Sequence, residues 1–87
     1  MACVYLLKSL VTGKKYTGST HEDNPEKRVA YHNAGKVKST KSGRPWELIY
    51  SEKFDNYTGA RKRELFLKTG KGRGFVKNIW RDVRAVE

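Results

Sequence analysis

The sequence lacks several features that would assign it to a class of proteins. Its single cysteine, Cys3, excludes an internal disulfide and a zinc site built from several thiolates. So little cysteine is typical of a reducing compartment, and we expect a cytoplasmic protein. No apolar run approaches the roughly 20 residues that a membrane-spanning helix needs, and nothing at the N-terminus has the pattern of a signal peptide. The sequence therefore predicts neither a membrane span nor a membrane partner.

Acidic residues are scarce as well. Aspartate and glutamate number 9 against 19 lysines and arginines in 87 residues, so the formal net charge is +10 and the pI is near 10.0. This imbalance favours a polyanionic partner, and nucleic acid is the first candidate. With 37% hydrophobic residues and a mean hydropathy of −0.81, the chain can build one small core under a very polar surface. Its length predicts a single domain over residues 1–87.

The N-terminal residues predict a β-hairpin. Residues 3–7 form a continuous apolar run of strand length, and residues 15–17 resume strand-forming character. Between them, Gly13 can adopt the positive φ that a hairpin loop requires. We therefore expect a hairpin over residues 3–19, with Tyr5 and Tyr16 on neighbouring strands.

A helix and a basic loop should follow the hairpin. Asn24 can cap the free amides of a helix that begins near Pro25, and Gly35 can end it. Residues 36–45, "KVKSTKSGRP", contain four cations and no acid, which predicts an exposed basic loop. The stretch 46–54 then predicts a third strand, in which period 2 places apolar side chains on one face, namely Trp46, Leu48, Tyr50 and Phe54.

The C-terminal residues predict two helices. The first should span residues 57–69, with a cap from Asp55, Asn56 or Thr58, and should end at Gly70. The glycines of "GKGRG", residues 70–74, predict a flexible hinge that touches phosphate rather than a nucleotide pocket, because no strand precedes them. A final amphipathic segment repeats apolar residues at helical spacing, namely Phe75 or Val76, Ile79 and Val83.

The expected order is strand, strand, helix, strand, helix, helix. It predicts an α+β fold: a three-stranded antiparallel sheet, led by the hairpin and flanked by about three helices. Two tryptophans, Trp46 and Trp80, could stack on bases, but in a small domain we favour a place in the core.

Two groups of polar residues could carry chemistry. Arg28 and His32 lie at i and i+4 of the predicted helix, so a guanidinium and an imidazole share a face that could hold a phosphate. The alternative is an ordinary polar helix face. Glu64 is the only acid between Asp55 and Asp82, and it could anchor a divalent cation. The alternative there is an ion pair with Lys68 at i+4.

Together these residues make the sequence similar to the GIY-YIG nuclease family, to which the N-terminal nuclease of the UvrC repair enzyme belongs, and especially to its small stand-alone members. "CVY" at residues 3–5 stands for the first motif and "YTG" at 16–18 for the second, followed by Arg28, His32 and Glu64 in order. Cys3 replaces a glycine of the family pattern and Thr17 replaces an isoleucine. The resemblance covers nearly the whole chain.

The resemblance implies metal-dependent cleavage of DNA phosphodiester bonds, with RNA left open. The implied catalytic residues are Tyr5, Tyr16, Arg28, His32 and Glu64. Glu64 would hold one Mg²⁺ or Mn²⁺, and Arg28 would bind a phosphate oxygen. Either Tyr16 or Tyr5 would deprotonate water, with His32 accepting or passing the proton.

Further residues are expected to contact the nucleic acid. Gly18 would leave room for the phosphate backbone. The remaining expected contacts are cations, namely Lys36, Lys38, Lys41, Arg44, Arg61, Lys68, Lys71 and Arg73. Asn78 is a weaker candidate, since some family members use an asparagine in that region. Specificity could come from a protein partner or a homodimer. The alternative function is a basic module or a subunit of a repair or recombination complex that binds nucleic acid without cutting it.

Overall fold

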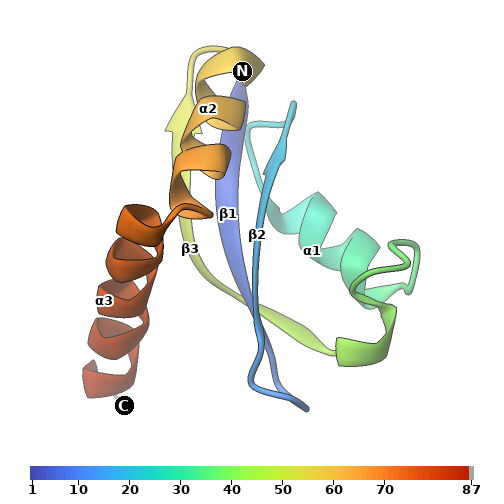
Figure 1. Ribbon diagram of the computed structural model, residues 1–87. Helices are drawn as coiled ribbons and strands as arrows, with labels where there is room; N and C mark the ends of the chain where they lie inside the picture. Colours follow the sequence, from blue (N-terminus) through green and yellow to red (C-terminus); the bar gives the residue numbers. More distant parts are fainter. Residues whose placement is uncertain (87) are drawn as a thin grey trace.

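The computed structural model describes the backbone of residues 1–86 and the side chains of residues 1–78. Within this range the chain forms a three-stranded sheet and three α-helices (Figure 1). The elements are, in order, β1 (Ala2–Ser9), β2 (Lys15–Thr20), α1 (Glu26–Asn33), the short 3-10 helix η1 (Lys41–Gly43), β3 (Trp46–Phe54), α2 (Tyr57–Leu67) and α3 (Gly70–Val86). The predicted ββαβαα order and α+β class are confirmed.

The sheet has the strand order β2-β1-β3 and is antiparallel throughout. β1 is the central strand, and residues 2–7 are buried, as expected for an apolar run covered on both faces. The predicted hairpin joins β1 to β2, and Gly13 in its loop has a φ of 76°. β2 is therefore an edge strand, with one side open for contacts outside the sheet.

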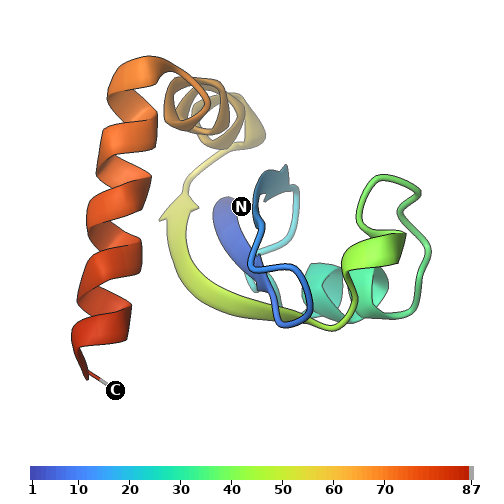
Figure 2. The ribbon, with the colours of Figure 1, turned by 60° about the horizontal axis from the view of Figure 1, so that its bottom comes forward.

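The helices lie on opposite faces of this sheet (Figure 2). On the first face, the buried Val4 and Leu6 of β1 pack with Leu67 of α2 and Val76 of α3. The second face belongs to α1. There, the other side chains of β1 pack with those of β2, β3 and α1, namely Tyr5, Leu7, Tyr16, Val29, Trp46 and Leu48. Each face thus has its own small core.

The predicted single apolar face of β3 is wrong. A β-bulge shifts the pairing of β1 with β3 between Leu6 and Leu7, so that Leu6 pairs with Tyr50 but Leu7 pairs with Leu48. Because the extra residue reverses the alternation, Trp46 and Leu48 face α1, whereas Tyr50 and Phe54 face α2 and α3. The bulge lets one strand contribute apolar side chains to both cores.

The segment between α1 and β3 carries the predicted exposed cations, but it also has buried anchors. Thr40 and Gly43 are buried, and the indole N–H of Trp46 donates a hydrogen bond of 2.7 Å to the Thr40 carbonyl. This confirms Trp46 as a core residue. At the start of α1, Pro25 rather than the predicted Asn24 is the N-cap residue, although the Asn24 side chain accepts a hydrogen bond of 2.9 Å from the Glu26 amide.

The expected hinge at residues 70–74 is wrong, because these residues form the first turns of α3. α2 ends at Leu67, two residues before the predicted end, and Gly70 begins the next helix instead of ending this one. A Cβ at Gly72 would collide with the Phe66 carbonyl oxygen and the Leu67 backbone, so this glycine allows α3 to turn closely against the end of α2.

The remaining expectations for the C-terminal helices divide in two. Asn56 is the N-cap of α2, since its side chain accepts a hydrogen bond of 2.9 Å from the Gly59 amide. In the predicted apolar stripe, Val76 is buried and Phe75 is partly exposed. The side chains of Ile79, Trp80 and Val83 lie outside the described residues. Among the helices described here, none has the length and apolar character needed to cross a membrane.

Candidate active site

The sheet register places the two motif tyrosines on the α1 face. Tyr5 pairs with Gly18 and Leu7 pairs with Tyr16, so the two phenols are diagonal neighbours with ring centroids 6.3 Å apart. A Cβ at Gly18 would lie 2.6 Å from the Tyr5 hydroxyl oxygen and 2.9 Å from a Tyr16 ring carbon. Glycine is therefore needed at this position to admit the phenol rings, and a contact of Gly18 with nucleic acid stays a prediction.

α1 brings His32 and Arg28 to the same face, as the i, i+4 spacing predicts. His32 is fully buried, and its ring centroid lies 4.9 Å from that of Tyr16. Its Nε2 atom is 3.1 Å from the Tyr5 hydroxyl oxygen, a buried hydrogen bond between β1 and α1. The motif residues Tyr5, Tyr16 and His32 thus form one aromatic cluster.

The hydrogen bonds around His32 favour one of its two tautomers. Nδ1 of His32 is 2.8 Å from the Thr40 hydroxyl oxygen, and that hydroxyl donates its own proton to the Val37 carbonyl at 3.3 Å. In that arrangement Thr40 accepts from His32, which favours the tautomer with the imidazole proton on Nδ1. The Nε2 lone pair then accepts the proton of Tyr5. The result is a directed chain from the Tyr5 hydroxyl through His32 to Thr40.

Burial keeps this chain uncharged. Desolvation, aided by the positive charge of Arg28, lowers the pKa of His32 to about 4, so the imidazole is neutral at pH 7. Burial also raises the pKa of the Tyr5 phenol, although the neighbouring Arg28 guanidinium acts in the opposite direction. A resident phenolate at Tyr5 is consequently disfavoured in the protein alone.

Arg28 is oriented toward the cluster with donor capacity to spare. Its guanidinium lies over the Tyr31 ring, 4.7 Å from the centroid, and interacts with the Tyr5 hydroxyl, which raises the pKa of the arginine. Its Nε atom is buried, and among the described residues it has no hydrogen-bond partner. An unpaired buried donor is costly, so a phosphate oxygen at this point would satisfy it.

Glu64 approaches the cluster from the other side of β2. It lies on α2 and is only 4% exposed. Its Oε1 accepts hydrogen bonds from the Ser19 hydroxyl and from Arg61 at 2.9 Å, and its Oε2 accepts one from Lys68 at 2.6 Å. Successive residues of a strand face opposite sides of the sheet, and Gly18 shares the α1 face with its partner Tyr5, so Ser19 faces α2. Glu64 is near enough to Tyr5 for its negative charge to raise the phenol pKa.

These partners keep Glu64 ionised. Burial by itself would raise the pKa of this carboxyl, but hydrogen bonds from Lys68, Ser19 and Arg61 outweigh burial and hold the pKa below its usual value. The Lys68 ion pair offered as the alternative role of Glu64 is therefore present, together with a second ion pair from Arg61. The carboxylate is saturated by two cationic side chains.

The donor set at Glu64 fits a hard divalent cation. Among the described residues, no group of three or more His, Cys, Asp or Glu side chains could hold a metal. Mg²⁺ commonly binds through one or two carboxylates, keeps several waters and takes further oxygens from substrate phosphate. A single ionised carboxylate such as that of Glu64 meets that need when substrate phosphate supplies further oxygens. The side chains of Arg61 and Lys68 are 48% and 49% exposed, so they have room to move aside.

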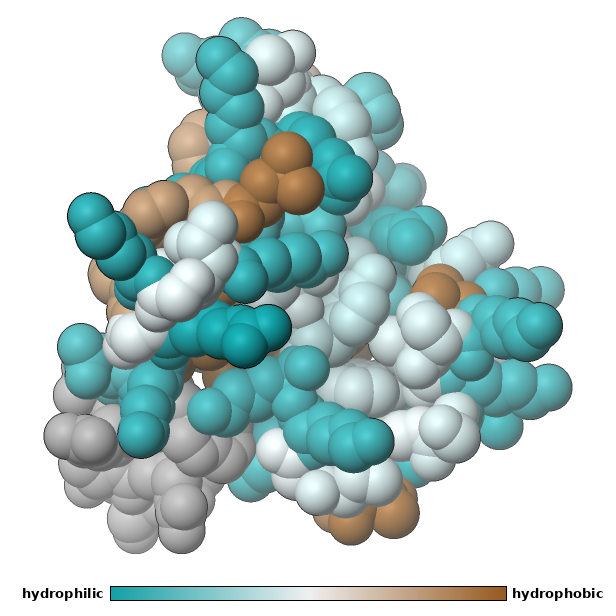
Figure 3. Space-filling model, viewed as in Figure 1, coloured by the Kyte–Doolittle hydropathy of each residue, from teal (hydrophilic) through white to brown (hydrophobic). Residues whose placement is uncertain are grey.

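The predicted nucleic-acid contacts divide into two basic regions. One region follows α1 and consists of exposed side chains, namely Lys36, Lys38, Lys41 and Arg44. The other lies on α2 and α3 and is also exposed, namely Arg61, Lys68, Lys71 and Arg73. Hydrophilic side chains dominate the face seen in Figure 3. Asn78 is exposed on α3. Glu64 lies within the second region, because Arg61 and Lys68 form ion pairs with it.

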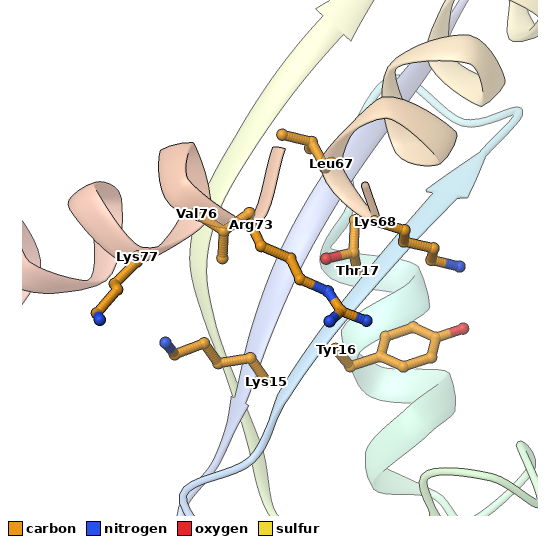
Figure 4. Close-up of a pocket in the computed structure, with 8 residues that line it drawn as sticks. All are labelled: Lys15, Tyr16, Thr17, Leu67, Lys68, Arg73, Val76 and Lys77. Carbon is orange, nitrogen blue, oxygen red and sulfur yellow. The ribbon is translucent and has the colours of Figure 1, made fainter. Parts of the chain in front are cut away.

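Several residues of the site were missed by sequence reasoning. Ser19 could have been found, because period 2 places it on the face opposite Tyr16, toward the helix that carries Glu64. Thr40 gave no signal, since only folding brings it to His32. Lys15 and Lys77 were also missed. They line a pocket of about 470 Å³ between β2 and the α2–α3 corner, where the predicted Lys68 and Arg73 also lie (Figure 4).

Comparison with known proteins agrees with this geometry. Residues 1–78 match the GIY-YIG catalytic domain. The chain is 45% identical over 67 residues to a UPF0213 protein of Staphylococcus haemolyticus, which covers 76% of this chain and 78% of the relative. It is 42% identical over 67 residues to UPF0213 proteins of Staphylococcus saprophyticus and Natronomonas pharaonis. Each of these alignments covers 76% of this chain, and they cover 78% of the first relative and 75% of the second. No solved structure matches the chain.

Proposed function

The chain belongs to the GIY-YIG family, whose members are typically nucleases, and from this premise we propose that it is an endonuclease that hydrolyses DNA phosphodiester bonds with one divalent cation. The observation that carries the proposal is the directed chain of hydrogen bonds from Tyr5 through His32 to Thr40. We place this activity in the cytoplasm. A protein partner or a second copy of the chain would supply sequence preference.

The proposed base is the pair of Tyr5 and His32. The low pKa of His32 keeps the imidazole neutral at pH 7, and in the favoured tautomer its Nε2 lone pair accepts the Tyr5 proton. As a water attacks phosphorus, its proton passes to the Tyr5 oxygen while the Tyr5 proton passes to His32. The water oxygen forms the new P–O bond. The ester P–O bond breaks, and the leaving oxygen keeps its electron pair. This relay avoids a resident phenolate, which burial disfavours.

Tyr16 has an orienting role in this proposal. Its ring contacts those of Tyr5 and His32, and its centroid lies 6.3 Å from that of Trp46 in an edge-to-face arrangement. Among the described contacts, the hydroxyl that bonds His32 belongs to Tyr5. Of the two candidate phenols, we therefore assign water activation to Tyr5 and substrate positioning to Tyr16.

Arg28 and Glu64 hold the phosphate on either side of the tyrosines. The buried, unpaired Nε of Arg28 would donate to a nonbridging oxygen, which orients the scissile bond toward the water. Glu64, together with substrate oxygens, would hold one Mg²⁺ or Mn²⁺. When bound, that cation supplies positive charge for the transition state and the leaving oxygen. Arg61 and Lys68 would release Glu64 and turn to the nucleic-acid backbone.

One observation favours a second candidate function. In the protein alone, both oxygens of Glu64 accept hydrogen bonds from cationic side chains. If these ion pairs persist on nucleic acid, Glu64 holds no metal and the protein is a basic binding module without cleavage. Its affinity would then fall steeply with salt, because phosphate contacts release counterions.

Incubation of the pure protein with labelled DNA tests the proposal. Single-stranded, duplex and branched DNA, and RNA, are each incubated with Mg²⁺, with Mn²⁺ and with EDTA. We expect metal-dependent products that Glu64→Ala abolishes while its circular dichroism spectrum and salt-dependent DNA affinity survive. Lys62→Ala, which alters an exposed residue of the same helix, is the control. Cleavage that continues in EDTA or in Glu64→Ala would overturn the proposal, and binding without products would establish the second function.

A further inference from the structure

A pocket of about 470 Å³ lies beside the aromatic cluster, between β2 and the corner where α2 meets α3. Four cationic side chains line it, namely Lys15, Lys68, Arg73 and Lys77. Figure 4 shows Arg73 extending from α3 across the pocket toward Tyr16 and Thr17 of β2. The pocket is thus a concave, strongly positive site outside the proposed water-activating residues.

The interior of the pocket has a different chemistry from its rim. Leu67 and Val76, which are 1% and 8% exposed, belong to the core on this face and provide apolar surface at the pocket wall. Tyr16 and Thr17 of β2 complete the lining on the strand side. A cationic rim above an apolar wall suits a ligand that combines an anion with a flat or apolar body. A simple inorganic anion would leave that wall unused.

Two residues connect this pocket to the proposed active site. Tyr16 lines the pocket and also contacts the His32 ring, at 4.9 Å between centroids. Lys68 lines the pocket and also donates a hydrogen bond of 2.6 Å to Glu64. A ligand in the pocket would therefore be an immediate neighbour of a phosphate held by Arg28 and Glu64. On a nucleic-acid strand, that neighbour is the adjoining nucleotide.

We propose that this pocket holds the nucleotide that adjoins the scissile phosphate on the substrate strand. This inference rests on the proposed nuclease function and adds a binding subsite to it. The guanidinium of Arg73 binds the phosphate of that nucleotide, where its paired N–H donors suit two phosphate oxygens. Lys77 adds charge at the rim, and the sugar and base lie against Val76 and the β2 strand at Thr17.

Binding of a mononucleotide, measured by NMR without any metal, tests this inference directly. Thymidine monophosphate is titrated into the protein and compared with thymidine and with inorganic phosphate. We expect thymidine monophosphate to bind more tightly than either, and to shift the amide resonances of Tyr16, Thr17, Lys68 and Val76. Arg73→Gln should weaken this binding about tenfold, since a charge-assisted hydrogen bond contributes that much.

Matched variants separate the phosphate contact from the apolar wall. Lys53→Gln removes an exposed charge from β3 and should leave the affinity unchanged. Val76→Thr replaces a methyl group of the wall with a hydroxyl and should reduce the advantage of thymidine monophosphate over phosphate. Because Val76 also belongs to the core, the amide spectrum of the variant without ligand must show an intact fold. Phosphate that binds as tightly as the nucleotide would overturn the inference, and so would equal losses in Arg73→Gln and Lys53→Gln.

The experiment also distinguishes failure of this inference from failure of the proposed function. Binding at the pocket in a protein that cuts nothing under any metal would remove the nuclease proposal and leave the nucleotide site. Metal-dependent cleavage with Arg73→Gln at full kcat/KM and unchanged nucleotide affinity would remove the subsite and leave the nuclease.

Discussion

The two halves of the candidate site lie on opposite faces of the sheet and differ in charge, burial and hydrogen bonding. On the α1 face, Tyr5, His32 and Thr40 are buried, uncharged and joined by directed hydrogen bonds. On the α2 face, Glu64 is ionised and is held by Arg61 and Lys68, whose side chains are about half exposed. Only the carboxylate itself is buried there.

This difference indicates different tasks for the two halves. Buried neutral groups with fixed tautomers can transfer a proton without first rearranging. Half-exposed ion pairs contribute little stability and can exchange one cation for another, because solvent screens them. We therefore regard the α1 half as already arranged for proton transfer and the α2 half as a replaceable set of cations around one carboxylate.

The largest expected effect distinguishes the roles of the two tyrosines, Tyr5 and Tyr16, in the α1 half. Tyr5→Phe removes the hydroxyl that donates to His32, and it should lower kcat by roughly 10² to 10³, the usual contribution of a general base. Tyr16→Phe keeps that hydrogen bond and should raise KM more than it lowers kcat. Steady-state cleavage rates of both variants, with metal at saturation, provide the measurement. Equal losses of kcat in the two variants would contradict the assigned roles.

Acid should lower the stability of the folded protein through His32 in the α1 half. The pKa of His32 is lowered from 6.5 to about 4 in the folded protein, so below pH 6.5 the unfolded chain binds a proton that the folded chain does not. The free energy of unfolding should hold steady above pH 7 and fall by up to about 3 kcal/mol as the pH drops to 4. Urea titrations between pH 4 and pH 8 measure this slope.

Two histidine variants test the origin of that slope. His32→Asn should remove most of it, whereas His21→Asn, at an exposed position stacked on Tyr57, should keep it. A slope that survives in His32→Asn would show that another group carries the acid sensitivity.

Sequence reasoning predicted the α1 half of the site better than its surroundings. The i, i+4 spacing correctly placed Arg28 and His32 on one helix face, and the hairpin correctly placed Tyr5 and Tyr16 on neighbouring strands. These relations are local, so the geometry of one helix or one hairpin determines them. The link from His32 to Thr40 depends on how an irregular segment folds back, which no local pattern encodes.

The errors in the predicted fold have the same cause. The β-bulge in β3 responds to two cores on opposite faces, and period 2 describes only a strand without an extra residue. Glycine has low helix propensity, which favoured a hinge at residues 70–74, but the close contact of Gly72 with the end of α2 requires glycine within a helix. In both places, tertiary packing outweighed the local preference.

The smallest expected effect tests the α2 half, where Arg61 and Lys68 surround Glu64. Lys68→Met removes the ammonium group that donates to Glu64 Oε2, while its unbranched side chain keeps helix propensity. Because a partly exposed ion pair contributes between a few tenths and about 1 kcal/mol, Mn²⁺ affinity of the protein without DNA should rise by no more than roughly two- to fivefold. Electron paramagnetic resonance of free Mn²⁺ measures this affinity without any cleavage.

Lys62→Met removes the same charge from the same helix at an exposed position, so it shows how much of the rise is a general charge effect. If both variants bind Mn²⁺ equally well, Lys68 does not compete with the metal for Glu64, and the two halves of the site differ less than their contacts indicate.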